Sequence, residues 1–508
     1  MRHVGSSRKS LVGDQAATGG LPVERNGINV IGSSERRGRP SSLFWPWCAS
    51  QIGVLAISYG SFLLGFGVSF WQATLAGVAG IVLSFLLVGF VSLAGQRGSA
   101  PTMVLSRAAF GVRGNVLPTA VSWLLLVGWE TVLVALATLA TATVFTALGW
   151  TAGTATKVIA FCVVAVAIVA AGMLGFDVIM KVQRWLTVLL AVMTVGYVAL
   201  TADKISWSAV SGLPGGSATE VLGALVLAAT SLGLGWVNSA ADYSRYLPRS
   251  VSGRAVVGWT TFGASIAPVL LVCYGVLLAG SSKGLSGKIA TDPIGALTTI
   301  LPTWYLVPFA LVAVVGLVAG AILDIYSSGL ALLTLGLRVQ RWKAAGIDGV
   351  VMILGTIYLV WIAANFLGPF QAFLITLGVP IAAWCGYFLG DLLLRRRDYA
   401  AADLYDPRGR YGAVNPIAVA ALVVGTVVGW GLVTSAARGF GWQGYLLGPV
   451  GLGGRTGSWA YANLGVLVAL VVGFIAALLS VGRIRGQEQD PTRSSAGRYG
   501  GVTSGRPG

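Results

Sequence analysis

Apolar runs about as long as a membrane is thick recur along this chain, and they constrain its fold more than any other feature. A helix needs about 20 predominantly apolar residues to cross the hydrocarbon core. Within lipid every backbone polar group must be bonded inside the protein, so a spanning segment is a helix or part of a closed barrel. The sequence therefore predicts an all-α polytopic membrane protein with twelve transmembrane helices, at residues 44–69, 71–94, 116–148, 156–175, 184–202, 219–241, 255–279, 305–337, 347–366, 369–393, 415–435 and 460–482.

The distribution of basic residues tests this topology and sets its orientation. An even number of spans places both chain ends on one side, and Lys and Arg gather on the cytoplasmic side of membrane proteins. Of the 34 basic residues, 28 fall in the tails or in loops on the tail side and six fall in the other loops. The net charge of +17 is thus explained by topology, and no nucleic-acid partner is expected. We expect a multi-pass protein of the cell (inner or plasma) membrane with both termini cytoplasmic.

The spans divide the chain into a core and flanking parts. Residues 1–42 are rich in Gly, Ser and Arg, and we expect a disordered cytoplasmic tail. Residues 43–393 form the expected ten-helix transport core, and 394–482 hold a loop and helices 11 and 12. Residues 483–508 are expected to be a second disordered cytoplasmic tail.

The composition offers few residues for a metal site or for a catalytic nucleophile. The single histidine, His3, lies in the polar tail, and the four cysteines fall one each in separate apolar segments. An enzyme would need a nucleophile with its base or a metal cluster. We therefore expect no metal, no cofactor and no enzymatic activity.

The sixth span contains an interruption. Val221 to Ala229 is continuous apolar helix, but Thr230-Ser231 and two glycines, Gly233 and Gly235, follow at mid-membrane depth. An unpaired peptide group there costs several kcal/mol, so such a break is tolerated only beside a cavity. The next polar and aromatic residues, Trp236, Asn238 and Ser239, could contact whatever fills that cavity. The pattern predicts half of a binding site on a discontinuous helix.

The first span shows a similar interruption. Ser50 and Gln51 follow Trp47, and Gly53 and Gly60 are expected to loosen the helix. Spans one and six would be equivalent in two five-helix repeats, at about 43–203 and 219–393, and an odd number of helices inverts the second repeat. The sequence therefore favours an inverted-repeat core.

Two acids lie deep inside predicted spans, Glu130 in span three and Asp324 in span eight. An intramembrane carboxylate is costly and faces protein, water or substrate. Both are candidate binding and proton-coupling residues; the alternative is a carboxyl that only ties two helices together. Trp129 and Trp236 could stack on a flat ligand, although most tryptophans of a membrane protein serve interfaces and packing.

Several motifs are typical of one transporter family: SRAAFGVRGNVLP (106–118), GWE (128–130), GWVNSAADYSRYLP (235–248), LDIYSSGL (323–330) and FQAFLITLGVPIAAWCGYFLGDLLLRR (370–396). Over about residues 44–440 the chain resembles the nucleobase:cation symporter-1 family of cytosine, purine, allantoin and hydantoin permeases. The resemblance implies the inverted-repeat (LeuT-like) fold, with ten core helices and two more, and a substrate held between spans one, three, six, eight and ten. It also makes Trp129 and Trp236 the substrate-stacking aromatics and places Asp324 where the family usually has Asn.

The departure at Asp324 bears on the substrate, because an ionised carboxylate only accepts hydrogen bonds. A ligand rich in N–H donors, such as an aminopyrimidine or a purine, is favoured over neutral uracil or hydantoin. Substrate contacts are expected from eight residues: Ser50, Gln51, Trp129, Glu130, Gly235, Trp236, Asn238 and Asp324.

The same resemblance bears on which ion is transported together with the substrate. Sodium-coupled relatives take hydroxyl ligands from span eight before the Asn-like position, but the corresponding turn here, residues 315–320, has no side-chain oxygen. Two intramembrane carboxyls, in contrast, can bind and release a proton. The expected function is import of a planar nitrogenous heterocycle by proton symport. A sodium-coupled carrier of hydantoin, allantoin or a vitamin such as thiamine or pyridoxine is the alternative, and a membrane-embedded enzyme or a channel fits less well.

Overall fold

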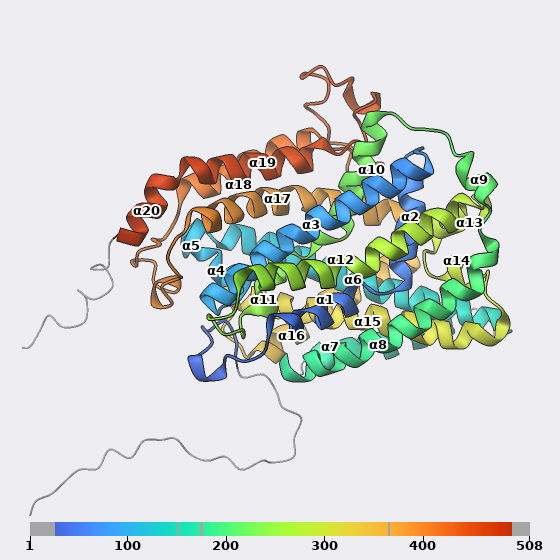
Figure 1. Cartoon of the computed structure of the whole chain (residues 1–508), viewed down its shortest axis with the longest axis horizontal. Helices are drawn as coiled ribbons and strands as arrows, with labels where there is room; N and C mark the ends of the chain where they lie inside the picture. Colours follow the sequence, from blue (N-terminus) through green and yellow to red (C-terminus); the bar gives the residue numbers. More distant parts are fainter. Residues whose placement is uncertain (1–25, 150, 152, 173–175, 364–365, 490–508) are drawn as a thin grey trace, which may run out of the picture.

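The computed structural model describes residues 26–149, 151, 153–172, 176–363 and 366–489. Within these residues the chain is helical without any strand, and most helices run along the long axis of one bundle (Figure 1). The core helices are α1 (Phe44–Gln51), α2 (Val54–Leu64), α3 (Phe70–Gly98), α6 (Val116–Ala147), α7 (Thr154–Gly172), α8 (Phe176–Thr201), α10 (Ala218–Ser231), α11 (Ala240–Ser244), α12 (Gly253–Gly280), α15 (Thr303–Thr334), α16 (Arg341–Ile357) and α17 (Leu367–Leu394). The C-terminal helices are α18 (Pro416–Gly431), α19 (Leu464–Leu479) and α20 (Val481–Gln489). Short helices in the connections are α4 (Thr102–Leu105), α5 (Arg107–Phe110), α9 (Trp207–Ser211), α13 (Lys283–Thr291) and α14 (Gly295–Thr298).

The apolar helices account for the predicted spans. Among the described residues, eight helices are long and apolar enough to cross a membrane, and two further pairs pass the same criteria as bent spans. The segments Thr154–Ala170 and Pro416–Gly431 are shorter apolar helices at two more predicted positions. Boundaries differ mainly at α8, which begins at Phe176 instead of residue 184, and at α16, which begins at Arg341 instead of residue 347. Residues 173–175 and 364–365 of two predicted spans lie outside the described residues.

The helix contacts repeat in the way that two inverted repeats require. In the first repeat α1/α2, α3, α6, α7 and α8 are spans one to five, and in the second α10/α11, α12, α15, α16 and α17 are spans six to ten. The contact of α7 with α15 has a counterpart in that of α16 with α6, and the contact of α8 with α15 has one in that of α17 with α6. Equivalent spans also meet directly, as α3 with α12 and α6 with α15. Outside this core, α18 and α19 pack along one flank against α17 (Figure 1).

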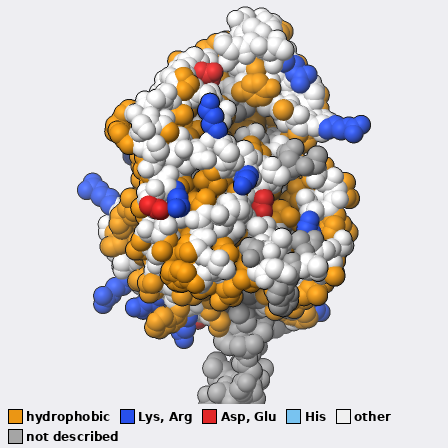
Figure 2. Space-filling view, turned by 90° about the vertical axis from the view of Figure 1, so that its right-hand side faces the viewer, with side chains coloured by type: hydrophobic (Ala, Val, Ile, Leu, Met, Phe, Trp, Pro, Cys, Tyr) orange, Lys and Arg blue, Asp and Glu red, His pale blue; other side chains and the backbone are white. Residues whose placement is uncertain are grey.

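Both ends of the described chain lie at one end of the bundle, which we call the tail side (Figure 1). The opposite end, called the far side, carries α9, α13 and α14. Figure 2 views this far side, where few charged side chains are scattered between hydrophobic and neutral groups.

The segment before α1 is ordered against the tail side, which corrects the prediction that residues 1–42 are a disordered tail. Residues 33–35 and 40–43 form 3-10 turns. Ile31 is fully buried, and its N–H donates to the Ser99 carbonyl at 2.8 Å. The Arg245 guanidinium donates to the Gly27 carbonyl, also at 2.8 Å. Backbone hydrogen bonds and an apolar anchor therefore hold residues 26–42, whereas residues 1–25 lie outside the described part.

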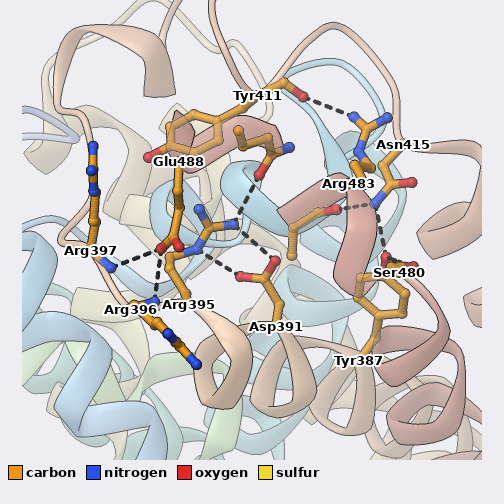
Figure 3. A network of polar contacts seen from close by, with 12 residues as sticks. Tyr387, Asp391, Arg395, Arg396, Arg397, Tyr411, Asn415, Ser480, Arg483 and Glu488 are labelled. Carbon is orange, nitrogen blue, oxygen red and sulfur yellow. Dashed lines mark hydrogen bonds and ion pairs between the residues drawn. The ribbon is translucent and has the colours of Figure 1, made fainter. Parts of the chain in front are cut away.

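The other predicted tail, 483–508, is also ordered at its start, because α20 continues through Gln489. Figure 3 shows how α20 is attached to the loop that follows α17. The Glu488 carboxylate accepts hydrogen bonds from the backbone N–H groups of Arg396 and Arg397, both at 2.8 Å. The Arg395 guanidinium donates to the Gln487 side chain at 3.1 Å. These contacts explain why the prediction of disorder is wrong for 483–489, and residues 490–508 lie outside the described part.

Candidate functional site

The sixth span is interrupted where the sequence predicts it. Helix α10 ends at Ser231, and Leu232 has φ −123° and ψ −98°, which no helix accommodates. Two 3-10 turns, 233–235 and 237–239, then lead into α11. A Cβ at Gly233 would lie 2.3 Å from the Ser84 carbonyl carbon of α3, so glycine is required by this close approach. The discontinuous helix is confirmed.

The first span is broken as well. Helix α1 ends at Gln51, Ile52 and Gly53 are extended, and α2 leaves at an angle of 64°. The expectation that Gly60 also loosens this span is wrong, because α2 is continuous through it. A Cβ at Gly60 would lie 2.3 Å from the Val276 nitrogen, so this glycine serves the packing of α2 on α12.

A cavity lies beside both breaks. Its wall combines the α1/α2 break, the end of α10, the middle of α6 and α15, and the loop before α14. Its lining includes Ser50, Gln51, Ile52, Gly53, Tyr59, Trp129, Leu133, Ser231, Leu232, Trp236, Ile294, Gly316, Gly320 and Asp324. One cavity thus receives residues from four spans that are far apart in sequence.

The cavity wall contains polar atoms that have no hydrogen-bond partner in the protein. These are the indole N–H of Trp129, the hydroxyl of Ser231 and both carboxyl oxygens of Asp324. Asp324 is only 1% exposed. Buried polar groups are almost always hydrogen-bonded, so a cluster of unsatisfied ones around a cavity indicates a polar ligand.

Five of the eight predicted contact residues line this cavity: Ser50, Gln51, Trp129, Trp236 and Asp324. The Gln51 amide donates to the Ser50 hydroxyl at 3.1 Å, which joins two of them. Trp236 stands edge-on to Trp47, with ring centroids 5.7 Å apart.

The other three predicted residues lie outside the cavity lining. A Cβ at Gly235 would lie 2.8 Å from the Trp129 indole nitrogen, so this glycine leaves room for the ring. The Asn238 amide donates to the Ser122 hydroxyl at 2.8 Å and ties the sixth span to α6. Glu130 is fully buried behind Trp129, and neither of its carboxyl oxygens has a hydrogen-bond partner in the protein.

Sequence reasoning missed three residues of this region. Tyr59 and Ser231 line the cavity, and the hydroxyl of Ser231 just before the break was a signal for the latter. Asp348 is fully buried near Glu130, although it lies close to the beginning of α16. Its burial depends on α6 and α15, which the local sequence does not contain.

The tail side of the cavity is closed by aromatic side chains. Trp47 and Tyr243 have ring centroids 5.4 Å apart, and both are at most 2% exposed. The Tyr243 hydroxyl donates to the Leu323 carbonyl of α15 at 2.7 Å. A bound molecule therefore has no direct opening to the tail side in this conformation.

Within the described residues, no group of three or more His, Cys, Asp or Glu side chains is arranged to hold a metal ion. The site instead combines a concave pocket, aromatic rings and a few polar atoms, as small-molecule binding sites do.

Comparisons with known proteins agree with this geometry. Residues 30–451 match the model of a family described as permeases for cytosine/purines, uracil, thiamine and allantoin. The protein "Putative purine-cytosine permease YxlA" of Bacillus subtilis (strain 168) is 22% identical over 419 residues, which cover 80% of this chain and 87% of that protein.

Solved structures of similar fold include two of Mhp1, a nucleobase-cation-symport-1 family transporter. Its closed form with bromovinylhydantoin bound has TM-score 0.69 and 20% identity, covering 92% of this chain and 98% of that one. Its inward-facing form has TM-score 0.64 and 19% identity, covering 92% and 96%. A Na⁺-coupled sialic acid symporter in a substrate-bound outward-open state has TM-score 0.55 and 13% identity, covering 88% and 91%.

Proposed function

The chain belongs to the family of permeases for cytosine/purines, uracil, thiamine and allantoin, and from that premise we propose that it imports an N–H-rich planar heterocycle, such as cytosine or a purine, by proton symport. It is a multi-pass membrane transporter with an inverted-repeat core and not an enzyme. Transport by such a core exposes one central site alternately to the two sides of the membrane.

One observation carries the choice of substrate: the unpartnered Asp324 carboxyl lies in the cavity wall together with Trp129 and Trp236. The indole rings provide flat apolar surfaces for a planar ligand. An ionised carboxylate only accepts hydrogen bonds, so it favours amino and ring N–H groups on the edge of the ligand.

The absence of side-chain oxygens in the turn of α15 before Asp324 supports proton over sodium coupling. Of its backbone oxygens, the Ala319 carbonyl already accepts a hydrogen bond from the buried Gln183 amide at 2.8 Å. A hard cation needs several oxygen ligands, and this turn supplies no side-chain oxygen. We therefore propose that Glu130 and Asp324 carry the coupling proton, and that 28 of the 34 basic residues mark the tail side as cytoplasmic.

A thermal-shift screen of the purified protein tests the substrate class, because a ligand that binds only the folded state raises the melting temperature. The screen compares cytosine, adenine, hypoxanthine, uracil, allantoin, hydantoin, thiamine and pyridoxine. We expect the largest shifts from cytosine and the purines. A shift from hydantoin, allantoin or a vitamin alone would replace the proposed substrate with the alternative one.

A further inference from the structure

A buried carboxyl outside the cavity, Asp348 on α16, is held by donors from two other helices. The Trp123 indole N–H of α6 donates to one of its oxygens at 2.6 Å. The Ser328 hydroxyl of α15 donates to the other at 2.9 Å. Asp348 is fully buried, so this arrangement is a fixed polar junction between three helices and not part of the protein surface.

A second carboxyl points to what this junction does. Neither Glu130 oxygen makes a hydrogen bond of good geometry in the protein, although the Ser328 hydroxyl lies close enough to interact with it, and the charges of Asp348 and Asp324 also act on it. Leaving both oxygens of a fully buried carboxyl unsatisfied is costly. If Glu130 only tied helices together, we would expect well-placed hydrogen-bond donors beside its carboxyl. A carboxyl that gains and loses a proton in turn needs a neighbouring group that can supply or accept that proton.

Asp324 and the hydrogen-bonded pair Ser328–Asp348 lie at different depths between the cavity and the tail side. Asp324 lines the cavity, and Ser328 lies one helical turn later on α15, about 6 Å nearer the tail side. Helix α16 begins at Arg341 on the tail side, so Asp348 lies about 10 Å from that end. Asp324 therefore lies farther from the tail side than the Ser328–Asp348 pair, and Glu130 contacts this region from α6.

The charge environment leaves these carboxyls free to exchange a proton. Among the described residues, the side chains that act on Glu130 and Asp348 are carboxyls, Ser328 and Trp123, and Tyr243 is a titratable neighbour of Asp324. Helix α7 packs against α6, α15 and α16, but none of its described charged side chains acts on Glu130 or Asp348. In the part of the chain that the structure describes, no lysine or arginine is among the side chains that act on these three carboxyls.

We propose that Asp348 receives the coupling proton from the cavity and passes it to the tail side, with Ser328 as the link to Glu130. The proposal rests on the proton symport proposed above. A proton that enters the cavity binds Asp324 and moves to Glu130. Glu130 gives its proton to the Ser328 oxygen as the Ser328 hydroxyl proton passes to the Asp348 carboxylate. Asp348 then releases one proton on the tail side, so one proton crosses for each that enters, and Trp123 positions the Asp348 carboxyl.

Proteoliposomes that contain a pH-sensitive dye and take up radiolabelled cytosine, adenine or hypoxanthine test this path. In Asp348→Asn we expect loss of base accumulation driven by a proton gradient and loss of internal acidification. Base binding and base exchange at equal pH should remain, because Asp348 does not line the cavity. Asp348→Glu should restore accumulation, and Ser328→Ala should impair it. The control is Ser211→Ala, an exposed serine of α9 on the far side, which should behave as wild type.

Accumulation and acidification by Asp348→Asn at the wild-type level would overturn the proposal. Loss of base binding in Asp348→Asn and Ser328→Ala alike, without rescue in Asp348→Glu, would also overturn it, since the junction would then be structural. A wild-type protein that accumulates these bases with a sodium gradient but not a proton gradient would instead refute the proposed symport.

Discussion

At the scale of single residues, helix geometry separates neighbours in sequence. Trp129 lines the cavity, whereas the next residue, Glu130, faces α15 and α16. Each helical residue turns by about 100°, so adjacent side chains seldom share a site. Asp324 instead shares the cavity with Trp236, from a helix far away in the sequence. Substitutions of Trp129 and of Glu130 can therefore test a proposed ligand contact and a proposed proton carrier separately.

Replacing Trp236 by alanine tests the stacking surface. We expect base affinity to fall by about 1 to 3 kcal/mol, the usual contribution of an aromatic ring stacked on a base. The measurement is a titration of purified Trp236→Ala with cytosine or adenine, followed by calorimetry. Trp185→Ala is the control, because this ring is 77% exposed on the outside of the bundle. Unchanged affinity in Trp236→Ala would exclude stacking.

Asp324→Asn tests whether the side chain at position 324 accepts hydrogen bonds from N–H groups on the edge of the ligand. An amide offers a donor as well as an acceptor, so one N–H of cytosine or adenine would face a donor. We expect their affinity to fall by about 1 to 3 kcal/mol, the usual effect of a mispaired buried polar group, and uracil to gain relative to them. Competition binding against a panel of bases measures this change. An identical ranking of bases in both proteins would remove Asp324 from ligand recognition.

At the scale of helices, glycine sets how closely the elements of the core approach. A Cβ on Gly275 of α12 would lie 1.9 Å from the Ile57 carbonyl oxygen of α2. Small residues allow backbones of membrane helices to meet, because packing rather than the hydrophobic effect drives their association. The half-helix α2 is thus held against α12 next to the break that forms the cavity.

Gly275→Ala is expected to lower the stability of the protein by about 1 to 3 kcal/mol, since an added methyl group overpacks this contact. The control is Gly258→Ala in the same helix, where a Cβ would meet nothing within 4 Å. There alanine should be neutral or stabilise by up to about 1 kcal/mol through its helix propensity. Melting temperatures in detergent compare the two, and equal values would contradict the close-packing argument.

The attachment of the loop after α17 depends on a buried ion pair between Asp391 and Arg395, 2.9 Å apart (Figure 3). Burial acts to lower the pKa of Arg395, and the charge and hydrogen bonds of Asp391 more than offset it, so the net pKa is raised. Asp391→Asn leaves this guanidinium buried without its counter-charge, and we expect a loss of about 3 to 5 kcal/mol.

The control for Asp391→Asn is Asp398→Asn, whose exposed carboxylate lies 3.4 Å from Arg97 and 3.8 Å from Arg249. Exposed pairs contribute about 0 to 1 kcal/mol, so this variant should melt close to wild type. A larger loss in Asp398→Asn than in Asp391→Asn would contradict the importance of burial.

At the scale of the whole molecule, the two repeats enclose one cavity whose tail side is closed. The closure consists of aromatic side chains from α1 and α11 and of the ordered segment before α1. In inverted-repeat transporters, opening of one side and closing of the other is largely a rocking of helix groups around a fixed site. The direction of net transport then follows the gradient of the coupled ion.

Replacing external sodium by choline at fixed pH should leave base uptake into proteoliposomes unchanged, whereas a protonophore should abolish accumulation. The reason is that the α15 turn lacks side-chain oxygens for sodium, while Glu130 and Asp324 can carry a proton. Glu130→Gln should remove the pH dependence of uptake. Full pH-dependent uptake by this variant would exclude Glu130 from coupling.

The sequence alone determined the positions of the spans and the breaks in spans one and six. A spanning segment is recognised from its own residues, because it must be apolar and must satisfy its backbone hydrogen bonds within one helix. Polar residues and glycines at mid-span depart from both requirements and so mark a break. The resemblance to one family over most of the chain placed Trp129, Trp236 and Asp324 at the centre of the candidate site. Nothing beyond these local and family patterns was needed to expect a transporter.

Only the tertiary structure decided where the remaining side chains point. It directs Asn238 to Ser122, turns Glu130 away from the cavity and joins Asp348 to Ser328 and Trp123. It also orders residues 26–42 against loops distant in sequence. Each outcome depends on the rotation and contact of separate helices, and a one-dimensional pattern does not contain the relative orientation of two helices.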